Sequence, residues 1–467
     1  MLTWPLAVGL AENGHSVTFL QATPNKNPHP NITEMNPANV KHLPPPNLVE
    51  LRLTFLNDTS NLEWVNSNKF DLVIIDALFN DCAYGLAYKW QAKTIVFGTT
   101  HVFDWFPDGF GFQDESSWIP SIHFSQDLPM GFFGRVQASV SYLYCHFNKQ
   151  FRGLPGLDLV LREKLGMPDM PPVSEMIMNT SLVFINTHYS EELARSLPPF
   201  VIPIGGMHVS ETVKPLPKEM EEFVKGSGDN GFIYVSFGSE ADMSKSPEFI
   251  RKIFFSAVGK IKTGFLWRWD GEKPVGMPDN VMTAKWMPQQ SILGHPKIRG
   301  FITHGGLLSM QEAVYHGVPM IVFPVFAEQD YNAERLHRTG RGIRLDFGSL
   351  TEPQLEDAIN RLLTDPRIKH EMKLTSARFK DRPSKPVDTA LWWTSYILRH
   401  EDTSFLRPGR LASSLSWYQR RQLDVWAFLS VTLLSLLYLI IKCCSKLLSL
   451  CCGRRKSEKV TKTKKRN

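Results

Sequence analysis

The sequence predicts an α/β protein with two doubly wound parallel sheets, followed by a single membrane-spanning helix. Short β-rich runs alternate with helical stretches in two separate series, which is the pattern of βαβ units around parallel sheets. The 467 residues exceed the roughly 250–300 at which one hydrophobic core stops growing, so two globular domains are expected. Hydrophobic residues at 43% and charged residues at 21% exclude a disordered or collagen-like chain.

The first series of elements predicts an amino-terminal domain over residues 1–205. Residues 2–13 predict an amphipathic helix that ends at Gly14. Residues 120–172 are aromatic and less regular, and predict loops and short helices around an apolar cavity. Strands are expected in four β-rich runs, namely 15–21, 70–76, 93–98 and 181–187.

The second series follows a proline-containing stretch and predicts another domain over residues 206–375. Residues 376–399 predict a helix that crosses both halves, within a segment of crossing helices and membrane-proximal linker over 376–423. Strands are expected in six runs, namely 231–239, 263–269, 281–286, 298–304, 318–324 and 343–348.

A membrane-spanning helix is predicted at residues 424–442, where seventeen consecutive residues carry no charge and cover about 25 Å of hydrocarbon. The alternative is a buried core helix. Residues 443–467 form a basic tail, and the segment from Lys442 onward holds ten Lys or Arg against one Glu. With a net charge of +6, the rest of the chain is slightly acidic, so no nucleic-acid partner is expected. A cytosolic tail predicts single-pass type I topology, with the domains lumenal.

The tail also carries sorting and modification signals. Lys464 and Lys465 resemble the dilysine signal of endoplasmic-reticulum membrane proteins, although a basic tail produces such a pair by chance. Four cysteines after the apolar run are candidates for S-acylation or remain unmodified, and without histidines they do not predict zinc: Cys443, Cys444, Cys451 and Cys452. Three lumenal glycosylation sequons occur, at Asn31, Asn57 and Asn179.

One stretch of the second half predicts a phosphate site. In residues 301–336 a strand ends in Thr-His-Gly-Gly and a helix follows at once. The glycines permit close backbone approach, the helix amino terminus offers free N–H groups, and His304 adds a donor. Glu312, one turn into the helix, is placed to accept hydrogen bonds from ribose hydroxyls.

These residues resemble the UDP-glycosyltransferase family, and within it the membrane-bound animal UDP-glucuronosyltransferase type. The similarity extends through WMPQQSILGHP, GGMHV, FIYVSFGS, LWRWDGEKP and DTALWWTSYILRH to the apolar helix and the tail. The resemblance implies the GT-B fold, in which two Rossmann-like domains enclose a cleft and the second binds the donor. It also implies a UDP-glucuronate or UDP-glucose co-substrate, a small lipophilic acceptor and a membrane location, with homo- or hetero-oligomers as an open option.

The resemblance assigns donor roles by position. Trp286 would stack on uracil or, alternatively, belong to the core. Glu328 would contact sugar hydroxyls, although the family more often has Asp there, or would be a surface carboxylate. Apart from the resemblance, the planar guanidinium of Arg268 is suited to meet a glucuronate carboxylate, and the alternative is a structural cation. The remaining donor residues are Ser239, Gln289, His304, Gly305, Gly306, Ser309, Glu312 and Gln329. No Asp-x-Asp occurs, so neither a metal nor another cofactor is expected.

The family mechanism inverts the anomeric centre, with a His as general base and an Asp that orients it. Asp76 matches the Asp, and Asp81 is a weaker candidate. The matching His would lie one position before Met1, which predicts that the start of the chain, with its signal peptide, first strand and base, is missing. His15 is expected to be structural. Candidate acceptor-pocket residues, which are alternatively plain core, are His101, Phe103, Trp105 and Phe106.

Two functions are therefore predicted. The first is an inverting glycosyltransferase for small lipophilic acceptors. The second is a donor-binding membrane protein with impaired catalysis, which acts as a partner of active family members.

Overall fold

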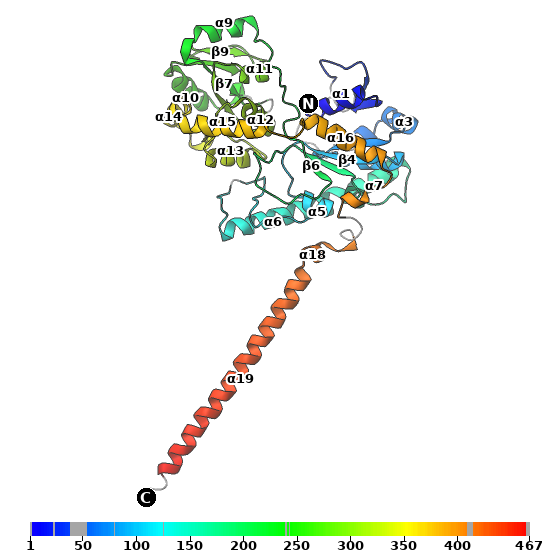
Figure 1. Ribbon diagram of the computed structural model, residues 1–467, viewed down its shortest axis with the longest axis vertical. Coiled ribbons are helices and arrows are strands. Elements are labelled where there is room, and N and C mark those ends of the chain that lie inside the picture. The colour runs from blue at the N-terminus through cyan, green and yellow to red at the C-terminus, as the bar shows by residue number, and fades with distance from the viewer. Residues whose placement is uncertain are drawn as a thin grey trace. The chain divides into compact units, whose positions relative to one another are not determined.

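The computed structural model describes residues 2–21, 24–37, 54–78, 80–124, 126–238, 241, 243–408 and 414–463. The chain divides into two compact units, Met1–Arg407 and Pro408–Asn467, which we describe separately. The first unit contains both predicted parallel sheets, shown in Figure 1. The predicted α/β class is thus confirmed.

The four-stranded sheet of the amino-terminal half is parallel throughout, and its spatial order follows the chain. Every side chain of its third strand is buried, as expected for a central strand covered on both faces. Its strands are β3 (Leu72–Asp76), β4 (Lys93–Gly98), β5 (Leu182–Ile185) and β6 (Val201–Pro203). The sequence did not predict β6, because this three-residue strand lies within the proline-containing stretch.

A separate two-stranded parallel sheet pairs β1 (Val17–Leu20) with β2 (Ile32–Met35). β1 was predicted, whereas β2 was not. Trp4 of the first helix, α1 (Trp4–Glu12), packs edge-on against Phe19 of β1. This pair of strands therefore packs on the predicted amino-terminal helix.

The six-stranded sheet of the second half has the order β12-β11-β10-β7-β8-β9. All its neighbouring strands are parallel, and the order reverses between β7 and β10. Its strands are β7 (Phe232–Ser236), β8 (Gly264–Arg268), β9 (Val281–Ala284), β10 (Ile298–Thr303), β11 (Met320–Val322) and β12 (Gly342–Arg344). Each lies within or within one residue of a predicted run.

Helices cover both sheets. Those of the first half are α1, α3 (Thr59–Ser67), α4 (Ala83–Trp90), α5 (Phe106–Phe110), α6 (Phe132–Asn148), α7 (Leu154–Leu165) and α8 (Val173–Met178). Those that follow are α9 (Lys218–Gly226), α10 (Glu248–Gly259), α11 (Gln289–Leu293), α12 (Leu307–His316), α13 (Gln329–Arg338), α14 (Glu352–Thr364), α15 (Pro366–Lys380) and α16 (Pro386–Arg399).

The prediction of only loops and short helices over residues 120–172 is wrong, because α6 has 17 residues and α7 has 12. The buried positions of α6 are Ala138, Ser141 and Tyr142, which lie three or four residues apart on one face. Small and polar side chains on that face hid the helical period.

The predicted helix over residues 376–399 is two helices. α15 ends before Asp381 and α16 begins at Pro386, because a proline disfavours helical geometry in the residue before it. α16 lies beside α1 in Figure 1, and a Cβ atom added to Gly9 would come within 2.7 Å of Leu391 Cδ1. Lys93 Nζ on β4 donates to the Ile397 carbonyl at 2.6 Å. The chain therefore returns to the amino-terminal half after completing the second sheet.

The second unit contains α18 (Trp417–Arg420) and the continuous helix α19 (Leu423–Thr463), drawn from orange to red in Figure 1. Within the described residues, Leu423–Leu448 is the one segment long and apolar enough to cross a membrane, with a mean hydropathy of 2.1. This segment contains the predicted span. Cys443 and Cys444 are exposed, while the Cys451 and Cys452 side chains and Lys464–Lys465 lie outside the described residues.

Candidate functional site

The strand order reverses between β7 and β10, and open α/β sheets bind ligands beyond the carboxyl ends of the strands at such a point. Ser236 and Thr303 are paired at these ends, so the segments that follow them lie side by side. Ser239, in the first of these segments, lies outside the described residues.

His304 lies tightly between two glycines. A Cβ atom on Gly238 would lie 2.7 Å from His304 Cε1, and one on Gly306 would lie 2.6 Å from Nε2. Gly238 and Gly305 have φ values of +77° and +89°, which disfavour any larger residue. Burial lowers the pKa of His304 to about 4, so the neutral imidazole offers one N–H donor.

The amino end of α12 adjoins His304. Its N-cap residue, Gly306, provides no side-chain hydrogen bond, so the first N–H groups of the helix are free of a side-chain cap. Such groups and the positive end of the helix dipole favour an anion. This geometry agrees with the predicted diphosphate site.

Glu312 lies in a line of hydrogen-bonded side chains from α11 and α12. Gln289 Nε2 donates to Glu312 Oε2 at 2.6 Å and to Ser309 Oγ at 3.0 Å. Gln290 Nε2 donates to Glu312 Oε1 at 3.0 Å. Burial raises the pKa of Glu312, and the two glutamine hydrogen bonds oppose the rise. The predicted residues Gln289, Ser309 and Glu312 thus form one polar cluster.

Trp286 precedes this cluster, in the loop between β9 and α11. Its side chain is 66% exposed, which excludes the alternative that it belongs to the core. The core tryptophans of this half are instead Trp267 and Trp269, which are both buried. An exposed indole three residues before Gln289 is available for stacking on a flat ring.

Arg268, at the end of β8, holds the turn after β7. Its guanidinium donates to the Gly238 carbonyl and, from Nε, to the Lys285 carbonyl at 3.4 Å. These contacts favour the structural cation over the carboxylate ligand, which were the two roles the sequence left open.

Glu328 and Gln329 lie at the start of α13. Gln329 is only 2% exposed, and its Oε1 accepts the amide hydrogens of Val325 and Phe326 at 2.9 and 3.2 Å. Its side chain therefore shapes the preceding loop, in which Ala327 has a φ of +56°. Glu328, the N-cap residue of α13, is half-buried.

Asp76 ends β3 in the amino-terminal half. Its Oδ1 accepts the Leu78 amide hydrogen at 2.8 Å, and burial raises its pKa. Asp81 instead forms an ion pair with Lys149, with 2.8 Å between Oδ1 and Nζ. The pairing gives Asp81 a structural role, whereas Asp76 is the carboxylate at a strand end.

The four candidates for the acceptor pocket differ in their surroundings. His101 is 1% exposed and contacts Glu192 through Nδ1 and Asn332 Oδ1 through Nε2, the latter at 2.6 Å. It therefore joins the amino-terminal half to α13. Phe106 is fully buried in the core of that half. Phe103 and Trp105 are half-buried at its edge.

The sequence missed Gln311, a polar residue of α12 that immediately precedes Glu312 in the chain. Gln311 Oε1 accepts the Gly206 amide hydrogen at 3.1 Å, and its Nε2 donates to the Asn186 carbonyl at 2.9 Å. The available signal was a polar residue at an otherwise apolar position of α12, since Gln311 is 1% exposed.

The described residues contain one group with metal-ligand chemistry: Asp104, His123 and Cys145 place their donor atoms within 4.8 Å of one another. Asp104 Oδ2 already accepts hydrogen bonds from Ser121 and Ser141 at 2.6 and 2.9 Å. The protein itself satisfies this carboxylate, and burial raises the pKa of Cys145 to about 11, which disfavours a thiolate ligand.

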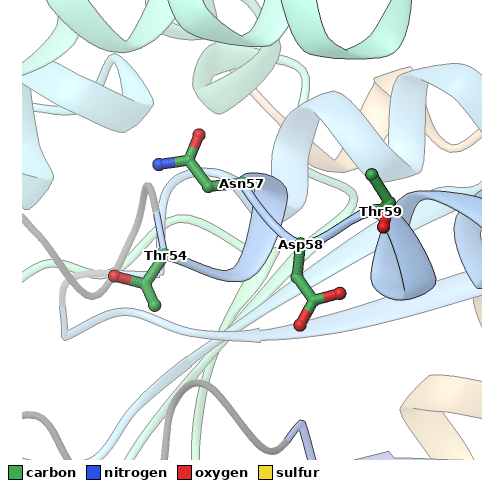
Figure 2. Close-up of a pocket in the computed structure, with 4 residues that line it drawn as sticks. All are labelled: Thr54, Asn57, Asp58 and Thr59. Carbon is green, nitrogen blue, oxygen red and sulfur yellow. The ribbon is translucent and has the colours of Figure 1, made fainter.

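An open depression of about 430 Å³ lies at the amino end of α3, and four residues line it: Thr54, Asn57, Asp58 and Thr59 (Figure 2). Asp58 caps the helix by accepting the Ser60 amide hydrogen at 2.9 Å. Asn57, like Asn31 and Asn179, is exposed. The depression therefore contains an accessible sequon, and its carboxylate is engaged in the cap.

Known proteins resemble the chain in both sequence and fold. The family described as "UDP-glucoronosyl and UDP-glucosyl transferase" matches residues 49–458. UDP-glucosyltransferase 2 of Dactylopius coccus is 33% identical, over 97% of this chain and 91% of its own length. UDP-glucuronosyltransferase 2B7 of Homo sapiens is 34% identical, over 81% of this chain and 70% of its own length.

Among solved structures, the spinosyn forosaminyltransferase SpnP superposes with a TM-score of 0.56 at 18% identity, over 85% of this chain and 95% of that one. The glycotransferase of kitacinnamycin superposes with a TM-score of 0.55 at 17% identity, over 85% and 94% of the two chains. At this identity the likeness concerns the fold, and it supports the GT-B architecture.

Proposed function

The chain belongs to the family of UDP-glucuronosyl and UDP-glucosyl transferases, and from this premise we propose that it transfers glucuronate or glucose from a UDP-sugar to a small lipophilic acceptor. The observation that carries the proposal is the Glu312 carboxylate, held by Gln289 and Gln290 on the helix that starts beside His304. A fixed carboxylate one turn from an anion site suits a ribose followed by a diphosphate.

Each part of the donor has a candidate partner in this proposal. Trp286 stacks on the uracil ring, and Glu312 accepts hydrogen bonds from the ribose hydroxyls. His304 and the first N–H groups of α12 hold the diphosphate and stabilise the charge that develops on departing UDP. Glu328 and Gln329 are the proposed contacts of the sugar, and the hydrogen bonds of Gln329 to Val325 and Phe326 support the loop that precedes Glu328.

The proposed reaction is one displacement that inverts the anomeric centre. The acceptor hydroxyl loses its proton to a general base and attacks the anomeric carbon while UDP departs. Asp76 is the carboxylate proposed to orient that base, because it lies half-buried at a strand end and burial raises its pKa. Phe103 and Trp105 are proposed to contact a lipophilic acceptor, since both lie half-buried at the edge of the core.

A second function is donor binding without efficient transfer. It is favoured by one observation: within the described residues, Asp76 Oδ1 accepts the Leu78 amide hydrogen, and no hydrogen bond joins Asp76 to an imidazole. Lack of a general base typically costs about 10²–10⁴ in rate. Acceptors that need no base, such as carboxylates, would then react better than alcohols.

We also propose that the chain is a type I protein of the endoplasmic-reticulum membrane with a cytosolic tail. The apolar segment Leu423–Leu448 and the ten basic residues from Lys442 onward support this topology. The three exposed sequon asparagines agree with a lumenal first unit.

The experiment uses the full chain purified in detergent. UDP binding is measured by calorimetry, and transfer is then measured by mass spectrometry with UDP-glucuronate or UDP-glucose and a panel of phenols and carboxylic acids. Gly238→Ala is expected to weaken UDP binding about 100-fold, because the added Cβ would clash with His304. Gly276→Ala is the matched control, with a φ of +86° but no atom within 4 Å of the added Cβ.

Product formation, with inversion of the donor anomer seen by NMR, supports the transferase. UDP binding without product under any of these conditions supports the second function. Failure of the unmodified chain to bind UDP contradicts both.

A further inference from the structure

The segment that joins the two halves hydrogen-bonds to α11 and α12, the helices that carry the polar cluster of Gln289, Ser309 and Glu312. The Ser210 amide donates to Gln290 Oε1 at 2.7 Å, and His208 Nε2 donates to the Leu308 carbonyl on α12 at 3.1 Å. Gly206 donates to Gln311 Oε1 on the same helix. Residues 206–210, which we name the joining segment, therefore contact both α11 and α12.

Gln290 connects the joining segment directly to Glu312. Its Nε2 donates to the His208 carbonyl and to Glu312 Oε1, both at 3.0 Å, which uses both amide hydrogens. With Oε1 bound to Ser210, every polar group of this side chain is engaged.

The joining segment does not hold the Glu312 carboxylate with a positive charge. His208 Nε2 lies 3.8 Å from Glu312 Oε1, but burial lowers the pKa of His208 to about 4, so the imidazole is neutral at pH 7. The neutral amide of Gln290 therefore donates to Glu312 Oε1, and that of Gln289 donates to Oε2.

We propose that Gln290 is a positioning residue for ribose recognition, which fixes Glu312 relative to the joining segment. This inference rests on the proposed function. Beyond that function, we expect selectivity for the ribose hydroxyls to depend on Gln290, which contacts the joining segment, as well as on Glu312.

The test compares the affinities of the full chain for UDP and for 2′,3′-dideoxy-UDP, which lacks both hydroxyls. The unmodified chain is expected to prefer UDP at least ten-fold. Gln290→Met keeps the length of the side chain but removes its hydrogen bonds. It should reduce the preference for UDP several-fold, mainly by lowering the affinity for UDP. Gln290→Glu replaces the donor with a carboxylate and should reduce the preference further. Glu312→Gln gives the reference for lost ribose recognition.

Gln354→Met is the matched control, because Gln354 is exposed in the cap of α14 and should leave both affinities unchanged. Thermal unfolding without nucleotide measures how much each variant loses in stability. The inference would be overturned, and the proposed function left intact, if Gln290→Met lowered the affinities for both nucleotides equally or changed neither affinity. Failure of the unmodified chain to bind UDP would overturn both.

Discussion

The two halves of the first unit use their polar side chains in different ways. Around α11 and α12, Gln289 donates hydrogen bonds to both Ser309 and Glu312, and Trp286 is exposed in the loop before α11. In the first half, His101 is buried and contacts Glu192 and the Asn332 side chain of α13. Polar side chains around α11 and α12 thus contact one another within the second half, whereas His101 of the first half contacts a residue of the second. The proposed donor site therefore depends on hydrogen-bonded polar side chains, and the proposed acceptor contacts depend on aromatic side chains.

The first prediction tests whether Phe106 belongs to the core of the first half or lines an open acceptor pocket. Because Phe106 is fully buried, Phe106→Ala should lower the free energy of unfolding by about 3–5 kcal/mol. Urea denaturation followed by tryptophan fluorescence measures this loss. Phe103→Ala, at a half-buried neighbour, is the matched variant and should cost much less stability while changing acceptor affinity. The opposite ranking of the two variants would contradict the assignment of Phe106 to the core.

A second prediction tests the polar contacts between the halves by pH. Burial raises the pKa of Glu192, but the charges of His101, Arg335 and Arg195 and the His101 hydrogen bond lower it to about 2. The stability that this carboxylate contributes is therefore complete above about pH 4.5 and is lost as the pH falls toward 2, a loss on the order of 3 kcal/mol.

Urea unfolding at several pH values measures this dependence. Glu192→Gln should remove this part of the acid loss, whereas Glu401→Gln, at an exposed position, should leave it unchanged. Identical pH profiles for the unmodified chain and Glu192→Gln would show that the pair contributes nothing.

The smallest expected effect concerns Trp286, the proposed uracil contact in the second half. Trp286→Ala should weaken UDP binding about ten-fold, since base stacking on an aromatic residue contributes about 1–3 kcal/mol. Stability should hardly change, because the indole is 66% exposed. Trp392→Ala removes another exposed indole, on α16, and should not change UDP affinity. A large loss of stability in Trp286→Ala would indicate a packing role.

The sequence predicted most of the second half because its signals are local. Each strand of the six-stranded sheet is an apolar run, and most of the predicted donor residues lie in one short part of the chain, from Trp286 to Gln329. Hydrogen bonds between this part of the chain and distant residues were not predicted. Gln311 contacts Asn186, 125 residues away, and no periodicity or spacing marks such a contact.

The first half was less predictable for a related reason. β2 and β6 are short, and α6 has an inner face of small and polar residues, so hydrophobic period alone did not reveal them. The break between α15 and α16 was signalled by Pro383 and Pro386, which the prediction of one continuous helix ignored. The roles of His101 and Arg268 depend on distant partners that the sequence does not identify.

The return of α16 to the amino-terminal half affects how this protein is made. Ala390 and Ile397 of α16 complete a core that also contains Leu6 of α1 and Ile95 of β4. When the ribosome has synthesised β6, about 190 residues remain before Ile397 emerges, which takes roughly 10–40 s at 5–20 residues per second. During this interval the nascent first half exposes the apolar surface that α16 later covers. Chaperones are therefore expected to bind this surface until the second half has been translated.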